Sequence, residues 1–233
     1  MEKKEFPKKQ ADQKKNPDSK SKTESKISGK LKWISDRAAD IIKLILGICL
    51  LPFVYSSAKS FLIQISNVNN SLQNCFWTGV LTLILIHLFI WEPAAIYNGG
   101  HKLLEIVFNF FQPLVKVAPY LLPIYTIVAF IVYGLLSLFI KENWLIQYAM
   151  FIFGLSIALH LIFASRTLRS KKGDILMSNY IFGFSFIFII NLGLLSFLLS
   201  LMLNDYSFIK YSNYTYSLAV EIFRAFFSQL FLV

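Results

Sequence analysis

YIFGFSFIFIINLGLLSFLLSLML, residues 180–203, is a run of 24 residues without a single charged side chain. A transmembrane helix needs about 20 consecutive apolar residues, so this run is long enough to cross a bilayer. Inside lipid only helices and closed barrels satisfy every backbone group, and the run has the length of a helix rather than of a barrel strand. The stretch therefore predicts a spanning helix and, with it, a helical membrane fold.

Four more apolar runs precede this one along the chain. They cover residues 41–58, 76–97, 120–140 and 144–164. The first run is short, and it reaches the length of a span only if residues 61–65 are included. Only 15% of all residues are charged, whereas soluble domains carry about 25%. We therefore expect an all-α, polytopic helical membrane protein with about five transmembrane helices, and the composition argues against a cytosolic globular enzyme.

The two ends of the chain differ from this apolar middle. Residues 1–43 hold 13 of the 23 basic residues and 7 of the 13 acidic ones, and burial of their few apolar side chains cannot offset the entropy lost on ordering. Beyond residue 218, polar residues recur at helical spacing, which is typical of an amphipathic helix lying in the membrane interface. We predict three parts: a disordered Lys-rich cytoplasmic tail (1–36), a multi-span helical domain (37–203), and a polar loop with an amphipathic C-terminal helix (204–233).

The basic residues also predict the orientation, because cytoplasmic loops are enriched in lysine and arginine. With a cytoplasmic N-terminus, the loops on that side carry Lys102, Lys116, Arg166, Arg169, Lys171 and Lys172, and the other side receives Lys59, Lys141 and Lys210. The sequence thus predicts a multi-pass integral membrane protein with a cytoplasmic N-terminus and a non-cytoplasmic C-terminus.

The lipid bilayer is the first partner that this organisation implies. Four basic residues crowd the membrane surface, and each attracts anionic lipid by about 1 kcal/mol; they are Lys30, Lys32, Arg37 and Lys43. Nucleic acid is not expected as a partner, because no aromatic residues alternate with these charges to stack on bases.

The most specific local feature is EPAAIYNGGHKLLE, residues 92–105. His101 and Glu105 are four residues apart, so on a helix they share a face and both can reach one cation. In the competing interpretation, His101 is an interfacial histidine and Glu105 is a solvated charge that pairs with a nearby lysine. Both interpretations stay open at the level of sequence.

The run resembles the motif region of site-2-type intramembrane metalloproteases, in which a proline and a tyrosine precede a glycine and an HExxH motif. APYLLPIYT, residues 118–126, resembles the stretch that opens their next span. Later segments at 153–160, 173–176 and 188–191 resemble further landmarks of that family in the same order. The resemblance covers about residues 76–200 and implies the helical scaffold of a zinc-dependent intramembrane protease.

The departures from the family pattern fall on the chemistry. Both histidines of HExxH bind zinc there, and the glutamate is the general base. This chain keeps His101 but has Lys102 in place of the base and Glu105 in place of the second histidine. The resemblance also implies Asp174 as a carboxylate ligand, so the candidate metal ligands are His101, Glu105 and Asp174, with a helix cap as the alternative role of Asp174. We expect no cofactor, with zinc as the alternative.

Four more polar residues lie within or beside the predicted spans: His87, Glu92, His160 and Asn191. Ionisable groups in such places are candidates for function, although we favour hydrogen bonds to neighbouring helices for the histidines and for Asn191. The leading hypothesis is a protease-like scaffold that holds a membrane partner without cleaving it. The alternatives are an active zinc-dependent intramembrane protease with non-standard ligands, and a small transporter or channel lined by His87, Glu92 and His160.

Overall fold

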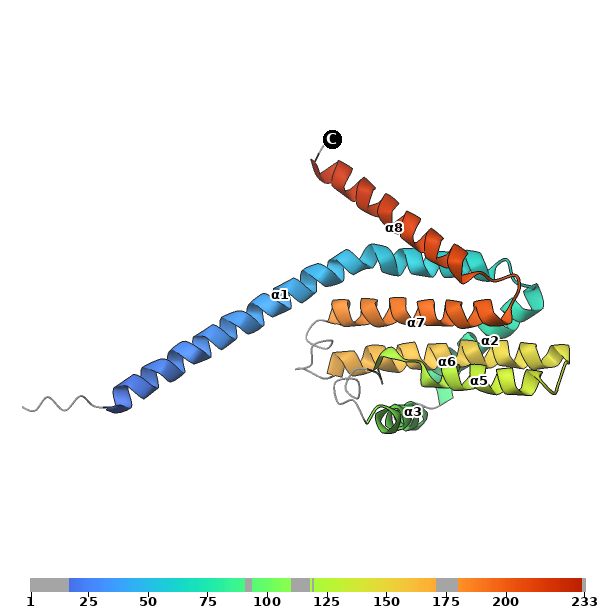
Figure 1. Cartoon of the computed structure of the whole chain (residues 1–233), viewed down its shortest axis with the longest axis horizontal. Coiled ribbons are helices and arrows are strands. Elements are labelled where there is room, and N and C mark those ends of the chain that lie inside the picture. Colours follow the sequence, from blue (N-terminus) through green and yellow to red (C-terminus); the bar gives the residue numbers. More distant parts are fainter. Residues whose placement is uncertain (1–16, 91–93, 110–117, 119, 171–179, 232–233) are drawn as a thin grey trace, which may run out of the picture. The chain divides into compact units, whose positions relative to one another are not determined.

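The computed structural model describes residues 17–90, 94–109, 118, 120–170 and 180–231, with the backbone alone for residues 17–34, 36, 90, 169 and 170. Its elements are α1 (Pro17–Ile65), α2 (Asn70–Leu85), the π-helix η1 (Ile86–Ile90), α3 (Ala94–Val107), α5 (Ile124–Ser137), α6 (Asn143–Ser170), α7 (Tyr180–Met202) and α8 (Phe208–Phe231), drawn in Figure 1. No strand occurs in these residues, so the prediction of an all-α fold is confirmed.

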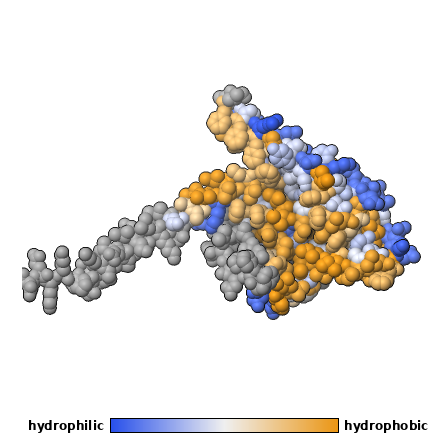
Figure 2. Space-filling view, in the orientation of Figure 1, coloured by the Kyte–Doolittle hydropathy of each residue, from blue (hydrophilic) through white to orange (hydrophobic). Residues whose placement is uncertain are grey.

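Four helices are long and apolar enough to cross a membrane: Arg37–Ile65, Asn70–Phe89, Asn143–Leu168 and Tyr180–Met202. They correspond to four of the five predicted spans, and the protein is a multi-pass helical membrane protein. On the face shown in Figure 2, hydrophobic side chains cover much of the surface, as expected where a protein meets lipid rather than water.

The remaining predicted span, residues 120–140, is shorter in the structure than in the sequence analysis. Its helix α5 has 14 residues, fewer than the roughly 20 that cross a bilayer. Pro123 is the N-cap residue of α5, and a proline has no N–H with which to continue a preceding helical turn. Hydropathy registers the apolar side chains of this stretch and not the break in its backbone.

Helix α1 begins at Pro17, and proline suits the first turn of a helix because its missing N–H needs no partner there. The chain divides into two compact units, Met1–Ile42 and Lys43–Val233. Residues 17–36 of the first unit have helical backbone. Residues 1–16 lie outside the described part of the chain, and their disorder stays a prediction.

In the second unit, α2 and α6 pack with their backbones in contact. A Cβ atom added to Gly79 would lie 2.0 Å from the carbonyl oxygen of Phe151, and one added to Gly154 would lie 2.0 Å from that of Phe76. Only glycine lets two helices approach so closely, as in small-residue contacts between membrane helices. The two glycines therefore fix how α2 and α6 cross.

Helix α8 begins at Phe208, so residues 208–217, part of the segment predicted as a polar loop, are helical. Two tyrosines of this region are buried, Tyr206 just before α8 and Tyr211 within it, whereas Tyr214 and Tyr216 are exposed. The hydroxyl groups of Tyr211 and Ser57 form a hydrogen bond that joins α8 to α1, and the Tyr206 hydroxyl donates to Ser196 Oγ of α7 at 2.8 Å. Removal of both phenols from water raises the pKa of Tyr206 and of Tyr211.

Candidate functional site

The two stretches that carry the family resemblance lie against each other in the structure. A Cβ atom on Gly100 of α3 would come within 2.7 Å of Ile124 Cγ2 and 2.8 Å of Tyr125 Cε2 at the start of α5. The Tyr125 hydroxyl donates a hydrogen bond to the carbonyl oxygen of Ile96 in α3. Gly100 thus makes room for the Tyr125 ring, and the ring holds α3 onto α5.

A second hydrogen bond joins α5 to α6. The hydroxyl groups of Thr126 and Ser156 lie 2.8 Å apart, and both side chains are buried. Ser156 also donates to the carbonyl oxygen of Phe153 within α6, at 3.2 Å. Because a carbonyl can only accept, the bond to Phe153 uses the hydroxyl proton of Ser156. When that bond is formed, the Thr126 hydroxyl is the donor and the Ser156 oxygen is the acceptor in the bond between the two side chains.

The break before Pro123 leaves carbonyl groups that need donors from elsewhere. In an unbroken helix the Tyr120 carbonyl would accept from the N–H of Ile124, but that N–H bonds the carbonyl oxygen of Leu122 instead, at 2.9 Å. His160 Nε2 of α6 lies 3.0 Å from the Tyr120 carbonyl oxygen. Because a carbonyl carries no proton, Nε2 is the donor.

Asn191 of α7 donates a hydrogen bond to the next carbonyl group along the chain, that of Leu121. Its Nδ2 donates to the carbonyl oxygen of Leu121 at 3.0 Å and to that of Ile187, one turn back in α7, at 2.8 Å. Non-helical backbone at membrane depth is stable only where the protein supplies hydrogen bonds to it. His160 and Asn191, from two different spans, supply two of these bonds at the break before α5.

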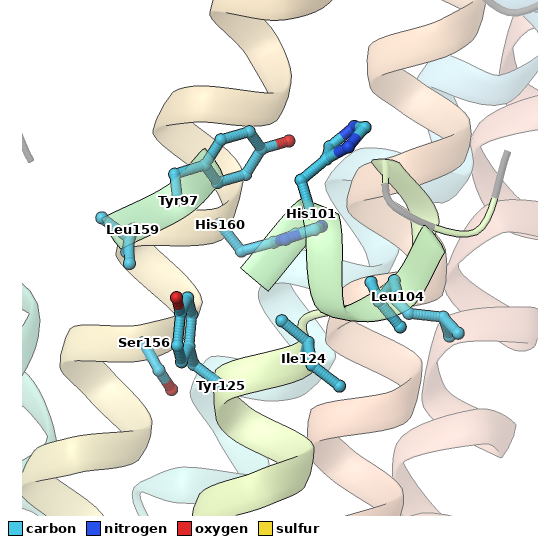
Figure 3. A pocket seen from close by; sticks show the side chains of 9 residues that line it. Tyr97, His101, Leu104, Ile124, Tyr125, Ser156, Leu159 and His160 are labelled. Carbon is cyan, nitrogen blue, oxygen red and sulfur yellow. The ribbon is translucent and has the colours of Figure 1, made fainter. Parts of the chain in front are cut away.

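A small cavity of about 10 Å³ lies among these groups (Figure 3). Its nine lining residues are Tyr97, His101, Leu104, Leu122, Ile124, Tyr125, Ser156, Leu159 and His160. A single water needs roughly 10–15 Å³, so the cavity offers the space of about one water molecule. A peptide substrate has no room there in this conformation.

Tyr97 lies between the two histidines of the cavity. Its ring centroid is 6.1 Å from that of His101 and 6.0 Å from that of His160, and Figure 3 shows the three side chains together. Burial raises the pKa of Tyr97, which lies outside the helices of spanning length. The phenol is therefore a neutral group at neutral pH.

The structure brings two of the three candidate metal ligands together. His101 Nδ1 lies 3.2 Å from Glu105 Oε1, as their spacing on one helix face predicts. Lys102, at the position of the missing base, is exposed. Asp174 lies outside the described residues, and among the described ones no three His, Cys, Asp or Glu side chains gather where they could hold a metal ion. A zinc site at His101, Glu105 and Asp174 stays a prediction.

Of the other polar residues singled out in the sequence, His160 lines the same cavity as His101, whereas His87 does not. His87 is in η1, where its ring stacks edge-on against Phe163 at 5.7 Å, and its buried Nδ1 has no hydrogen bond within the described structure. Glu92 is outside the described residues. Sequence reasoning missed the roles of Tyr125 and Ser156, although a proline inside an apolar run already signals carbonyl groups that need donors.

As it stands, the cluster around His160 is a set of hydrogen bonds and ring contacts that fastens α3 and α5 to α6. Such an arrangement positions helices and keeps polar backbone satisfied at membrane depth. No family model, curated protein or solved structure matches this chain.

Proposed function

We propose that this integral membrane protein is a site-2-protease-like scaffold that holds a membrane partner and does not hydrolyse peptide bonds. The observation that carries the proposal is the state of the polar groups around His101. Glu105 already pairs with His101, His160 already donates to the Tyr120 carbonyl, and the space between them is about 10 Å³. These groups hold helices together and leave no room for a substrate.

The residue types at the site favour the same conclusion. Zinc-dependent hydrolysis needs a bound water with a lowered pKa and a positioned acceptor for its proton. An ammonium group at Lys102 repels a metal cation and accepts no proton, and Glu105 replaces a neutral ligand by a charged oxygen. The chain thus lacks the acceptor at the motif position where such a protease carries it.

We expect the purified full-length chain to cleave no membrane-segment reporter and to hold no stoichiometric zinc. Reporter cleavage in liposomes, with and without a chelator, and metal analysis of the same sample measure both. The variant Lys102→Glu with Glu105→His restores the two motif positions and should retain zinc, and His101→Ala in that background should lose it. Cleavage by the native chain that both the chelator and His101→Ala abolish would overturn the proposal.

The partner surface that we propose is the aromatic face near the end of α8. The rings of Phe223, Phe227 and Phe231 form a ladder with centroid distances of 6.4 Å and 6.1 Å, and Phe227 and Phe231 are exposed. Large rigid apolar side chains of this kind are common anchors of interfaces. A partner helix with an aliphatic or aromatic face fits this surface.

A photoreactive amino acid at position 227, in the full chain in native membranes, should give one discrete cross-linked adduct. The same group at Phe139, which is exposed two residues beyond the end of α5, should give only lipid adducts. If both positions give lipid adducts alone, the proposed partner surface on α8 is wrong. The zinc and cleavage measurements test the rest of the proposal separately.

The orientation in the membrane is part of the same proposal, with the N-terminus in the cytoplasm and the C-terminus on the far side. Opposite sides for the two termini require a fifth crossing besides the four long helices, and we assign it to residues 120–137, which cross as a broken span that includes α5. The orientation is supported by the distribution of basic residues. Lys102 of α3 and Arg166 of α6 are exposed and are assigned to the cytoplasmic side. Lys141, between α5 and α6, and Lys210 of α8 are exposed and are assigned to the far side. The basic tail then faces the anionic cytoplasmic leaflet.

A further inference from the structure

A larger cavity, of about 220 Å³, lies among all four helices of spanning length. Every one of its eleven lining residues is hydrophobic, and they include Ala58 of α1, Trp77 of α2, Ala158 of α6 and Phe188 of α7. An engineered cavity of about 150 Å³ with a similar aliphatic and aromatic lining stays dry and binds benzene. An apolar occupant therefore suits this cavity better than water does.

The cavity is open toward the outside of the bundle. Leu62 and Trp77 line it and are 50% and 40% exposed. Small side chains at Ala58 and Ala158 leave the space unfilled. The close approach of Gly79 to Phe151 and of Gly154 to Phe76 fixes the backbones of α2 and α6 beside it. At this depth the medium outside a membrane protein is lipid hydrocarbon, so an acyl chain is the molecule that meets the opening.

One basic side chain lies beside the opening. Lys59 is exposed and three residues before Leu62 in α1, so the two share a face of the helix. It lies six residues before the end of α1 at Ile65, a rise of about 9 Å along the axis, so it stands near that end of the span. In the structure Lys59 Nζ lies 5.8 Å from the Tyr55 ring centroid, and no described carboxylate pairs with it.

We infer that this cavity binds one acyl chain of an anionic phospholipid whose phosphate pairs with Lys59. The apolar lining selects the chain, and the lysine selects the charge of the headgroup. A lone ammonium at the edge of the hydrocarbon is costly, and a lipid phosphate supplies its counter-charge. The inference does not depend on the partner surface of α8 or on the chemistry at His101.

The test uses the full-length chain in liposomes with Trp77 as the sole tryptophan, the other three being replaced by phenylalanine. Acyl chains that carry bromine quench tryptophan on contact. At equal mole fraction, a brominated anionic lipid should occupy the site about fivefold more than a brominated zwitterionic one, the equivalent of about 1 kcal/mol for one basic residue near anionic lipid. Lys59→Gln should remove the preference, and Lys141→Gln, a matched lysine away from the cavity, should keep it.

Filling the cavity provides the second arm of the test. Ala158→Phe should lower quenching by both lipids, and Ala58→Leu is the milder variant if the first does not fold. Ala225→Phe, at an exposed alanine of α8, is the control and should change nothing. Equal quenching by the two lipids in the native chain, or quenching that neither cavity variant changes, would overturn the inference. So would a photoreactive group at position 62 that cross-links to a protein and not to lipid, because a partner side chain would then fill the cavity.

Discussion

Gly154→Ala should unfold the bundle at a much lower temperature than the native chain, because a Cβ atom at this position would lie 2.0 Å from the Phe76 carbonyl oxygen. That oxygen belongs to backbone, so one of the two helices has to move. Ordinary overpacking of a core costs about 1–3 kcal/mol, and we expect the upper end of that range or more, with Gly154→Leu giving no folded protein. Thermal unfolding in detergent, followed by circular dichroism and size exclusion, measures the effect.

Two other glycines provide matched controls for this experiment. Gly134 of α5 and Gly193 of α7 have nothing within 4 Å of an added Cβ. Because alanine favours a helix over glycine by about 1 kcal/mol, Gly134→Ala and Gly193→Ala should leave stability unchanged or raise it. Gly79→Ala should reproduce the loss seen at Gly154, since its Cβ meets the Phe151 carbonyl oxygen in the same way. If Gly154→Ala melts at the temperature of the Gly134 control, the close crossing of α2 and α6 is wrong.

His160→Leu should destabilise the chain by about 1–3 kcal/mol, the cost of a buried acceptor left without a donor. The change keeps an apolar group of similar size but removes the donor to the Tyr120 carbonyl. His160→Gln keeps an N–H donor and should recover most of the loss. Denaturant titration of the purified protein gives both values.

The same measurement separates a structural histidine from a metal-binding or transport residue. For a structural role, His160→Gln retains stability and Asn191→Leu causes a loss of similar size, because Asn191 donates to the adjacent Leu121 carbonyl. The two losses should also be coupled in a double variant, since both donors act on one break in the backbone. Loss in His160→Gln as large as in His160→Leu would contradict the structural role.

Hydropathy was enough to predict the helices of spanning length, because length and apolar composition are local properties of the chain. It failed at residues 120–123, where a proline breaks the backbone without changing the polarity of the side chains. It also failed at the start of α8, where tyrosines that look polar in sequence bury their rings and bond Ser57 and Ser196. The first error arises because hydropathy does not describe backbone geometry, and the second because it does not describe partners that are distant in sequence.

The candidate site was predictable to the extent that it lies within one helix. The contact of His101 with Glu105 follows from a spacing of four residues. The bond from Tyr125 to Ile96 and the pairing of His160 with Tyr120 join residues that are 29 and 40 positions apart, and no periodicity within a single helix encodes such distances. They depend on how α3 and α5 pack on α6.

The π-helix η1 bears on how this chain tolerates changes in length. A π-turn holds one residue more than an α-turn, and one residue corresponds to about 100° of rotation in an α-helix. Gly79 holds the preceding part of α2 against α6, so a single-residue deletion upstream of it would have to shift that contact. A deletion within Ile86–Ile90 could instead be absorbed by turning the π-helix into ordinary α-helix. Natural length variation in this helix is therefore expected at η1, where an inserted residue already has a place.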